Sequence, residues 1–298
     1  MKYKVVTCFD ETLLKLNGSK LIEQFASSWQ PSIEFHCYYY NLDLSNYSLP
    51  KKKNIHYHNL NNIDGFPEFM ERNKTHDGTE GGSVQYNSII DVTSEGPKVF
   101  AISEEAFKDS NSWLFWLDAN CCTVRDIRLN SLKAIFSDDS NALSLALVEH
   151  RNHFAGFNLQ SQSVVELLAD VKGAYITDRF TDYREWGFNF ILGSILPIYQ
   201  ARGLNYKLFT ENGISVLNNL FVDLRDPASR KLRDAKGNRI VPLSDKETSP
   251  DILPGRYKQL ADIVRHYKPQ TILETGTWNG GRAIEMSLAA FEKSDKVH

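Results

Sequence analysis

An aspartate and an asparagine two residues apart follow the most apolar short segment of the chain. Trp113 to Leu117 are five consecutive apolar residues, and they run directly into Asp118, with Asn120 two positions later. Such a segment is typical of a buried central strand that delivers a carboxylate at its carboxyl end. A carboxylate with a second oxygen ligand two residues on can hold a hard divalent cation, which can bridge the phosphates of a nucleotide diphosphate. The alternative is that Asp118 merely caps a helix or turn after a core strand.

A second group of chemically active side chains precedes an apolar helical segment. Thr177 to Trp186 hold three carboxylates, two guanidinium groups and three aromatic rings. One of the carboxylates, from Asp178, Asp182 or Glu185, could serve as a general base that accepts the proton of an incoming hydroxyl group. The alternative is an exposed loop that ends in a capping box, with Thr181 or Asp182 as the helix cap and Glu185 completing the box. The residues alone weigh the two interpretations evenly.

A glycine-bearing turn near the end of the chain has the form of a cofactor-binding turn. Thr271 to Leu273 predict a strand, Arg282 to Phe291 predict a helix, and between them lie Glu274, Gly276 and Gly280. A strand followed by an acidic residue and a glycine turn into a helix can cradle the polar part of a cofactor. A generic strand-to-helix turn is the alternative.

The segments that would position these residues alternate between strand and helix patterns. The β-branched run Lys4 to Phe9 predicts an opening strand, the spacing of apolar residues over Leu13 to Trp29 predicts a helix, and Ile33 to Tyr40 predict a second strand. Helical spacing over Val99 to Phe107 then leads into the apolar pentad. This order is typical of an α/β domain with a mostly parallel sheet.

Further elements are expected beyond the pentad. The patterns predict a strand over Ala142 to Val148, a helix over Ser163 to Asp170, and a helix over Trp186 to Tyr199 that Pro197 interrupts. Residues 41 to 82 are polar and show few regular signals, so this stretch is either a functional loop region or holds elements that the pattern hides. Asp223 to Pro254 contain 13 charged residues and four prolines, which favours a linker.

Composition excludes several classes of protein. The chain has 298 residues with 34 basic and 37 acidic side chains, and its net charge of −3 argues against a nucleic-acid partner bound through a broad basic field. No run approaches the ~18 uninterrupted apolar residues of a membrane span. Four scattered cysteines and an opening segment unlike a signal peptide favour a cytoplasmic protein, in the host cytoplasm if the source is viral.

The segment WLFWLDAN, the opening strand and the helix over Lys98 to Phe107 together resemble GT-A-fold glycosyltransferases of the phage and bacterial polysaccharide type. These enzymes carry an Asp-x-Asp motif after a hydrophobic strand. The resemblance implies a mixed, mainly parallel sheet with flanking helices, a nucleotide-sugar donor, a glycan or small-molecule acceptor, and manganese or magnesium at Asp118 and Asn120. It also implies that Thr7 touches the nucleotide. Asn120 stands where the family has Asp, which removes one negative charge and weakens metal binding.

Glu274, Gly276 and Gly280 match the pattern E-x-G-x-x-x-G and resemble motif I of class I S-adenosylmethionine-dependent methyltransferases. The resemblance implies that the backbone at the glycines packs against the methionine part of the cofactor. The chain stops before the strand that would bind the ribose, so we expect a truncated domain and S-adenosylmethionine as a cofactor only in a longer form. The expected organisation is a transferase domain over residues 1–215, a linker over 216–254, and a partial βα unit over 255–298.

These observations predict a glycosyltransferase that moves a sugar from a nucleotide-diphosphate donor to a glycan or another hydroxyl acceptor. Two alternatives stay open at this point. One is a methyltransferase whose N-terminal domain recognises the substrate. The other is a catalytically inactive GT-A-like domain that only binds a glycan or a partner protein.

Overall fold

The computed structural model describes residues 2–79, 86–136, 143–145, 154–208, 220–223, 271–272 and 296–297. Two compact units divide the chain, Met1–Pro242 and Leu243–His298. In the second unit a short strand β12 (Thr271–Ile272) pairs in parallel with β13 (Lys296–Val297). Within the described residues, no helix has the length and apolar character needed to cross a bilayer.

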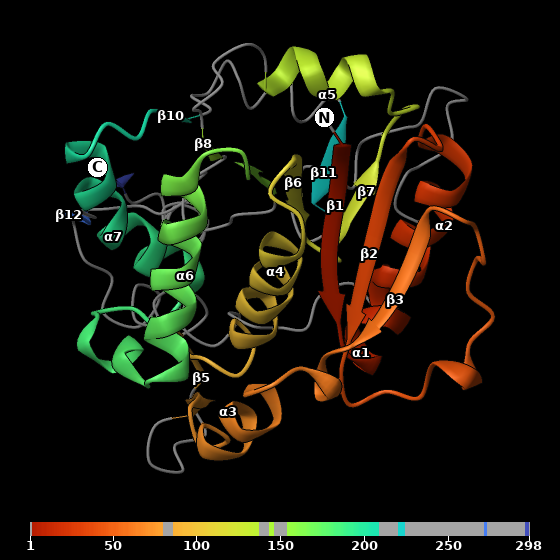
Figure 1. The fold of residues 1–298 in the computed structure, drawn as a ribbon. Helices are drawn as coiled ribbons and strands as arrows, with labels where there is room; N and C mark the ends of the chain where they lie inside the picture. Colours follow the sequence, from red (N-terminus) through yellow and green to blue (C-terminus); the bar gives the residue numbers. More distant parts are fainter. Residues whose placement is uncertain are drawn as a thin grey trace. The chain divides into compact units, whose positions relative to one another are not determined.

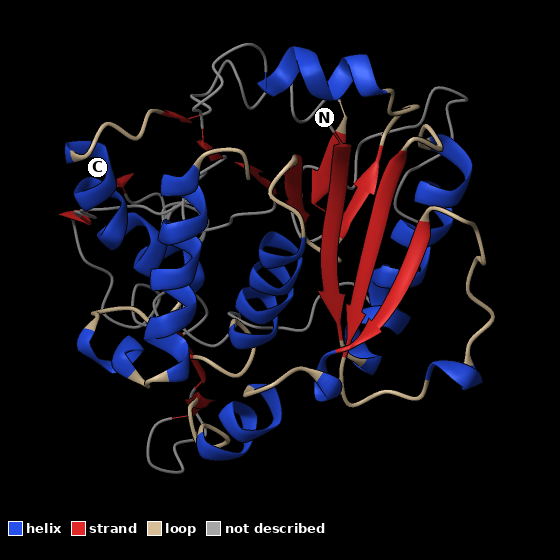
Figure 2. Ribbon diagram, viewed as in Figure 1, coloured by secondary structure: helices blue, strands red, loops and turns tan. Residues whose placement is uncertain are grey.

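A seven-stranded sheet forms the framework of the first unit, in the order β10-β8-β9-β6-β1-β2-β3 (Figures 1 and 2). All neighbouring strands in it run parallel except at β9, which is antiparallel to both β6 and β8. The expected mixed, mainly parallel sheet with flanking helices is therefore confirmed. The strands are β1 (Lys2–Phe9), β2 (Ile33–Tyr39), β3 (Ile55–Asn59), β6 (Ser112–Leu117), β8 (Leu143–Leu145), β9 (Phe154–Asn158) and β10 (Tyr206–Leu208).

Helices cover both faces of this sheet because successive strand residues point to opposite sides. Val6 of β1 and Trp116 of β6 belong to the core on one face, which α4 (Gly96–Lys108), α6 (Gln162–Ile176) and α7 (Phe188–Ala201) complete. Val5 and Phe115 belong to the core on the other face, which α2 (Ser19–Ser28) covers. Each fully buried large apolar side chain contributes roughly 1.5–3 kcal/mol, so these two cores hold the strands in register.

Shorter elements connect the framework. After β1 come α1 (Glu11–Leu13) and a π-helical turn η1 (Leu14–Gly18), and β4 (Asp77–Thr79) pairs with β5 (Tyr86–Asp91). Antiparallel pairing joins β7 (Cys121–Thr123) to β11 (Phe221–Asp223). The remaining elements are η2 (Leu44–Asn46), η3 (Leu60–Asn62), α3 (Phe66–Arg72), α5 (Leu129–Phe136) and η4 (Arg179–Asp182).

The polar stretch over residues 41–82 contains the edge strand β3 and helix α3, so of its two alternatives the one with hidden elements is right. One expectation about the elements needs correction. Pro197 does not interrupt α7, which continues to Ala201. Proline removes one helical hydrogen bond, and the burial of Ile195 and Tyr199 on the core side keeps the helix intact.

Candidate functional site

Asp118 directly follows the last residue of the central strand β6, at the carboxyl end of the sheet, where the parallel strand β1 also ends. The two strands are parallel, with Val6 opposite Trp116, so their carboxyl ends lie side by side. The Asp118 carboxylate accepts two hydrogen bonds at Oδ1, from the backbone N–H of Asn120 at 2.9 Å and from its side-chain amide at 3.0 Å. Asp118 thus closes an Asx turn that ends the strand, and the turn interpretation is right about its local geometry.

Asn120 links this turn to the segment that follows β1. Its side chain is almost fully buried, and its Oδ1 accepts a hydrogen bond from Nδ2 of Asn17 at 3.0 Å. Asn17 belongs to the π-helical turn η1. The structure therefore brings the two predicted metal-binding residues together, and it engages the amide oxygen of Asn120 with a protein donor.

Four charged side chains act on Cys8, the residue before the last of β1. Burial is the main cause that raises the pKa of the Cys8 thiol, and the negative charges of Asp118, Glu95 and Asp10 raise it further. The positive charge of Lys98 lowers it. Asp118 directly follows β6 and Asp10 directly follows β1, so two of these carboxylates lie at the carboxyl ends of the two central strands.

Lys98 is a buried cation outside the site residues that the sequence predicts. It lies in the first turn of α4, and its Nζ is 3.8 Å from Oε2 of Glu95. The ammonium group also lies over the rings of Trp116 and Phe188, at 5.3 Å and 4.9 Å from their centroids. A lysine is disfavoured at a helix N-terminus by the helix dipole, and this was the available signal in the sequence.

Glu95 precedes α4 and contacts the chain just after the segment that holds the predicted general bases, Thr177 to Trp186. Its Oε2 accepts a hydrogen bond from the backbone N–H of Phe188, the first residue of α7, at 3.1 Å. The N-cap of α7 is Gly187, without a side-chain cap bond. The capping box that Thr181 or Asp182 would form with Glu185, one of the two interpretations of this segment, is therefore wrong, because the helix begins later and a distant glutamate binds its free N–H.

The three predicted bases have different surroundings. Asp178 forms an ion pair with Arg72, with 3.0 Å between Oδ2 and Nε, and accepts a hydrogen bond from Asn73 at 2.9 Å. The hydrogen bond from Arg72 is the main cause that lowers the pKa of Asp178. Asp182 is exposed at the end of η4, and Glu185 is half-buried and accepts a hydrogen bond from Arg184 at 2.7 Å.

The predicted roles of the remaining residues stay predictions. Thr7 is completely buried, and its hydroxyl has no hydrogen-bond partner among the described residues, so its contact with a nucleotide stays a prediction. Glu274, Gly276 and Gly280 lie outside the described residues.

No protein-family model and no curated protein matches the chain. Among solved structures, mouse xyloside xylosyltransferase 1 in its apo form is 10% identical at a TM-score of 0.39, covering 70% of this chain and 85% of that one. The apo form of glycosyltransferase GlyE of Streptococcus pneumoniae is 12% identical at a TM-score of 0.37, covering 70% of this chain and 45% of that one. Another crystal structure of GlyE is 13% identical at a TM-score of 0.40. Galactosyltransferase LgtC, in complex with donor and acceptor sugar analogues, is 13% identical at a TM-score of 0.39, covering 64% of this chain and 70% of that one. At this level of similarity, no substrate or mechanism transfers to the chain.

Proposed function

We propose that this protein is a GT-A-type glycosyltransferase that moves a sugar from a nucleotide-diphosphate donor to a hydroxyl group of a glycan or small molecule. The observation that carries the proposal is the place of Asp118. Its turn ends the central strand β6 at the carboxyl end, beside the end of β1. Ligands of open α/β sheets bind outside the carboxyl ends of the strands.

The residues present fit a hard divalent cation. The Asp118 carboxylate and the Asn120 amide oxygen are oxygen ligands of the kind that magnesium and manganese accept, and such ions often take their other ligands from water and substrate phosphates. A bound ion would supply positive charge to the leaving diphosphate. The hydrogen bonds at Oδ1 of Asp118 do not prevent this, because a carboxylate offers about four lone-pair positions.

Lys98 would complement the ion in binding the diphosphate. Its ammonium group is buried and lies over the ring of Trp116, two residues before Asp118. Asn120 in place of an aspartate removes one negative charge, and Lys98 adds a positive one. Both features make the site more favourable for an anionic leaving group.

Glu185 is the preferred general base of the three carboxylates. It is half-buried next to Trp186, whose backbone N–H donates to the carbonyl of Ile89 at 2.8 Å. Asp178 is less suitable, because Arg72 and Asn73 both hold its carboxylate and lower its pKa, which makes it a weaker proton acceptor. Glu185 is paired with Arg184, whose side chain is 76% exposed and can move away. Asp182 remains the second choice, and the base role requires that the transfer inverts configuration.

One observation favours a second candidate, a domain that binds a nucleotide or glycan without turnover. The amide oxygen of Asn120 already accepts a hydrogen bond from Asn17, and the Asx turn is complete within the protein. A site with these partners could bind a ligand and still fail to hold the metal in a reactive position.

Thermal-shift screening of the full chain separates these candidates. The ligands are nucleoside diphosphates, nucleotide sugars and S-adenosylmethionine, each with and without manganese. A transferase should be stabilised by one nucleotide sugar with manganese and should release its nucleoside diphosphate. Stabilisation without release supports the binding domain, stabilisation by S-adenosylmethionine supports the methyltransferase alternative, and no response to any nucleotide contradicts the proposal.

A further inference from the structure

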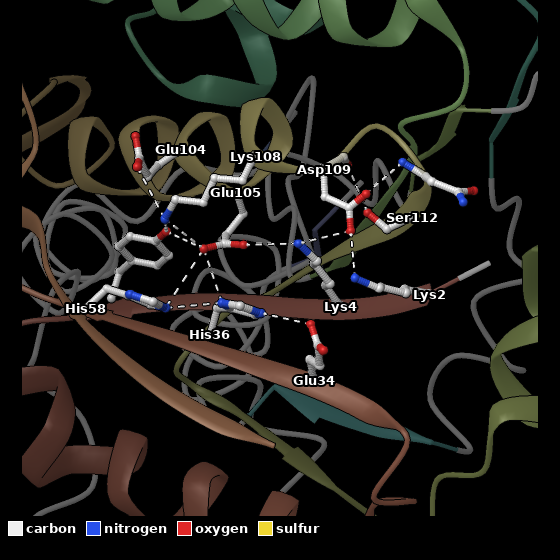
Figure 3. Close-up of polar contacts among 12 residues, drawn as sticks. Lys2, Lys4, Glu34, His36, His58, Glu104, Glu105, Lys108, Asp109 and Ser112 are labelled. Carbon is white, nitrogen blue, oxygen red and sulfur yellow. Dashed lines mark hydrogen bonds and ion pairs between the residues drawn. The ribbon is translucent and has the colours of Figure 1, made fainter. Parts of the chain in front are cut away.

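A compact polar cluster lies between the sheet and the C-terminal half of α4. It joins His36 of β2, His58 of β3 and Glu105 of α4 (Figure 3). Within the described residues, these three form the group of histidine and acidic side chains whose ligand atoms all lie within 4.8 Å of one another. The site is distinct from the Asp118 turn, because Lys4, in the amino-terminal half of β1, pairs with Glu105 at 3.6 Å.

We propose that His36, His58 and Glu105 bind a transition-metal ion of the zinc class. Nδ1 of His36 lies 3.1 Å from Nε2 of His58 and 3.1 Å from Oε1 of Glu105, and the third separation is 3.9 Å. Ligand atoms around a tetrahedral zinc ion, at bond lengths of ~2.0–2.1 Å, are about 3.3 Å apart. The three atoms therefore form one face of such a tetrahedron after only small movements.

Hydrogen bonding among the described residues leaves one ring nitrogen of the cluster without a partner. Nε2 of His36 is buried without a hydrogen-bond partner and lies 3.5 Å from Oε2 of Glu34. A neutral imidazole carries one proton. If that proton is on Nδ1 to serve Glu105, the bare Nε2 faces the Glu34 carboxylate.

Metal binding at Nδ1 of His36 removes this conflict. The ring proton then sits on Nε2 and points toward Glu34. A metal-binding histidine usually donates its other N–H to a carboxylate, which fixes the ring orientation and makes the ligand more basic. Glu34 thus has the place of an outer carboxylate.

The position of His58 is also suitable. Its Nε2 lies 3.1 Å from Nδ1 of His36 and 3.9 Å from Oε1 of Glu105, so it faces both other ligand atoms. The ring is partly exposed, which leaves a route for the ion and room for a water ligand.

Lys108 is the main competitor of a metal ion. Its Nζ lies 3.2 Å from Oε1 of Glu105, the same oxygen that accepts from Tyr38 at 2.6 Å. The lysine side chain is 44% exposed and also lies 3.2 Å from Oε1 of Glu104. It can therefore leave Glu105 and keep an anionic partner, so the ion can replace it at low cost.

A bound ion would tie three elements together at the edge of the sheet. It would link the edge strand β3 to β2 and to helix α4, and its binding free energy would add to the stability of the folded state. Zinc should therefore raise the Tm of the full chain.

The test is calorimetric titration of the chelator-treated full chain with zinc chloride, together with the Tm at each ratio. We expect one ion per chain. His58→Gln removes a partly exposed ligand and should lower the affinity by at least about 100-fold, since even outer-sphere changes cost 10–100-fold. Lys108→Met should tighten binding several-fold by removing the competing charge.

Two controls give the result its meaning. His56→Gln changes the neighbouring histidine of β3, whose ring lies 4.8 Å from that of His36 but which is outside the trio, and it should leave zinc affinity unchanged. Asp118→Asn should also leave it unchanged. Absence of zinc binding by the wild-type chain, equal affinity in His58→Gln, or equal losses in His56→Gln and His58→Gln would each overturn the proposal.

Discussion

The two ends of strand β6 carry the same three-residue pattern, Asp-x-Asn, in the same local turn. Oδ1 of Asp109 accepts the backbone N–H of Asn111 at 2.9 Å, and Oδ1 of Asp118 accepts that of Asn120 at 2.9 Å. Each pattern is therefore first of all an Asx turn that delimits the strand. The pattern by itself does not identify a ligand site.

The surroundings of the two turns differ. At the amino end of the strand, Oδ2 of Asp109 lies 3.4 Å from Nζ of Lys2 and 3.6 Å from Nζ of Lys4 (Figure 3). At the carboxyl end, Asp118 lies beside the end of β1, where open α/β sheets bind their ligands. The difference teaches that the position in the sheet, and not the motif, distinguishes a structural carboxylate from a candidate ligand.

The largest expected effect is the loss of turnover when the carboxyl-end turn is changed. Asp118→Ala should lower kcat/KM for the nucleotide sugar by about 10²–10³-fold, because charge stabilisation at the leaving group is lost. Asp109→Ala should leave kcat/KM of the folded fraction unchanged. Steady-state release of the nucleoside diphosphate measures both, and equal losses in the two variants would remove the functional difference between the turns.

The free energy of unfolding should show the opposite pattern from turnover, with the larger effect at Asp109. Asp109→Ala removes the acceptor for Asn111 and takes one carboxylate from the buried Lys4, so it should lower the free energy of unfolding by about 1–3 kcal/mol. Urea unfolding checks this value. Asp109→Asn keeps the turn acceptor and should recover part of the loss, and an unchanged midpoint in Asp109→Ala would show that the ion pairs contribute nothing.

The asparagine of each turn, Asn120 or Asn111, offers a further test of how the two ends of β6 differ. Asn120→Asp restores a second negative charge at the carboxyl end and should tighten manganese binding by about tenfold, since charge count tunes such affinities. Asn111→Asp adds the same charge at the other end and should create no manganese site. Titration calorimetry with manganese alone tests the pair, and similar behaviour of both variants would mean that an added acid at either turn suffices.

The smallest effect is expected at Asp178, which is ion-paired as Asp109 is. Asp178→Asn loses the ion pair with Arg72 and should cost less than about 1 kcal/mol, because the carboxylate is partly exposed. The pKa of Asp178 is lowered in the folded state, so its contribution is present above the unfolded-state pKa and disappears as the pH falls through the lowered value. Unfolding of both proteins at neutral and acidic pH measures this, and a large loss of turnover would instead assign Asp178 as the base.

The sequence predicted what local patterns determine. Five apolar residues were enough to predict β6 and the place of Asp118 at its end. Strand β3 was missed because it is short and has only two apolar residues, Ile55 and Tyr57, and because its His58 lies near Glu105 of α4.

The clusters of polar and charged residues could not be predicted from the sequence, for another reason. Tyr38 and Glu105 are 67 positions apart, and Glu95 binds the N–H of Phe188, 93 positions away. Such partners come into contact only when the sheet and its helices assemble, so no local spacing in the sequence predicts these contacts.

The most direct test of the central claim is the affinity of the full chain for a nucleoside diphosphate with manganese, measured by calorimetry for the wild type, Asp118→Asn and Asp109→Asn. Asparagine keeps the Oδ1 acceptor that the turn requires and removes only the charge. Our account predicts that Asp118→Asn loses manganese-dependent binding by at least about tenfold at an unchanged Tm, whereas Asp109→Asn keeps it. Unchanged nucleotide affinity with a lowered Tm in Asp118→Asn would show that Asp118 only caps the turn, and would contradict the account.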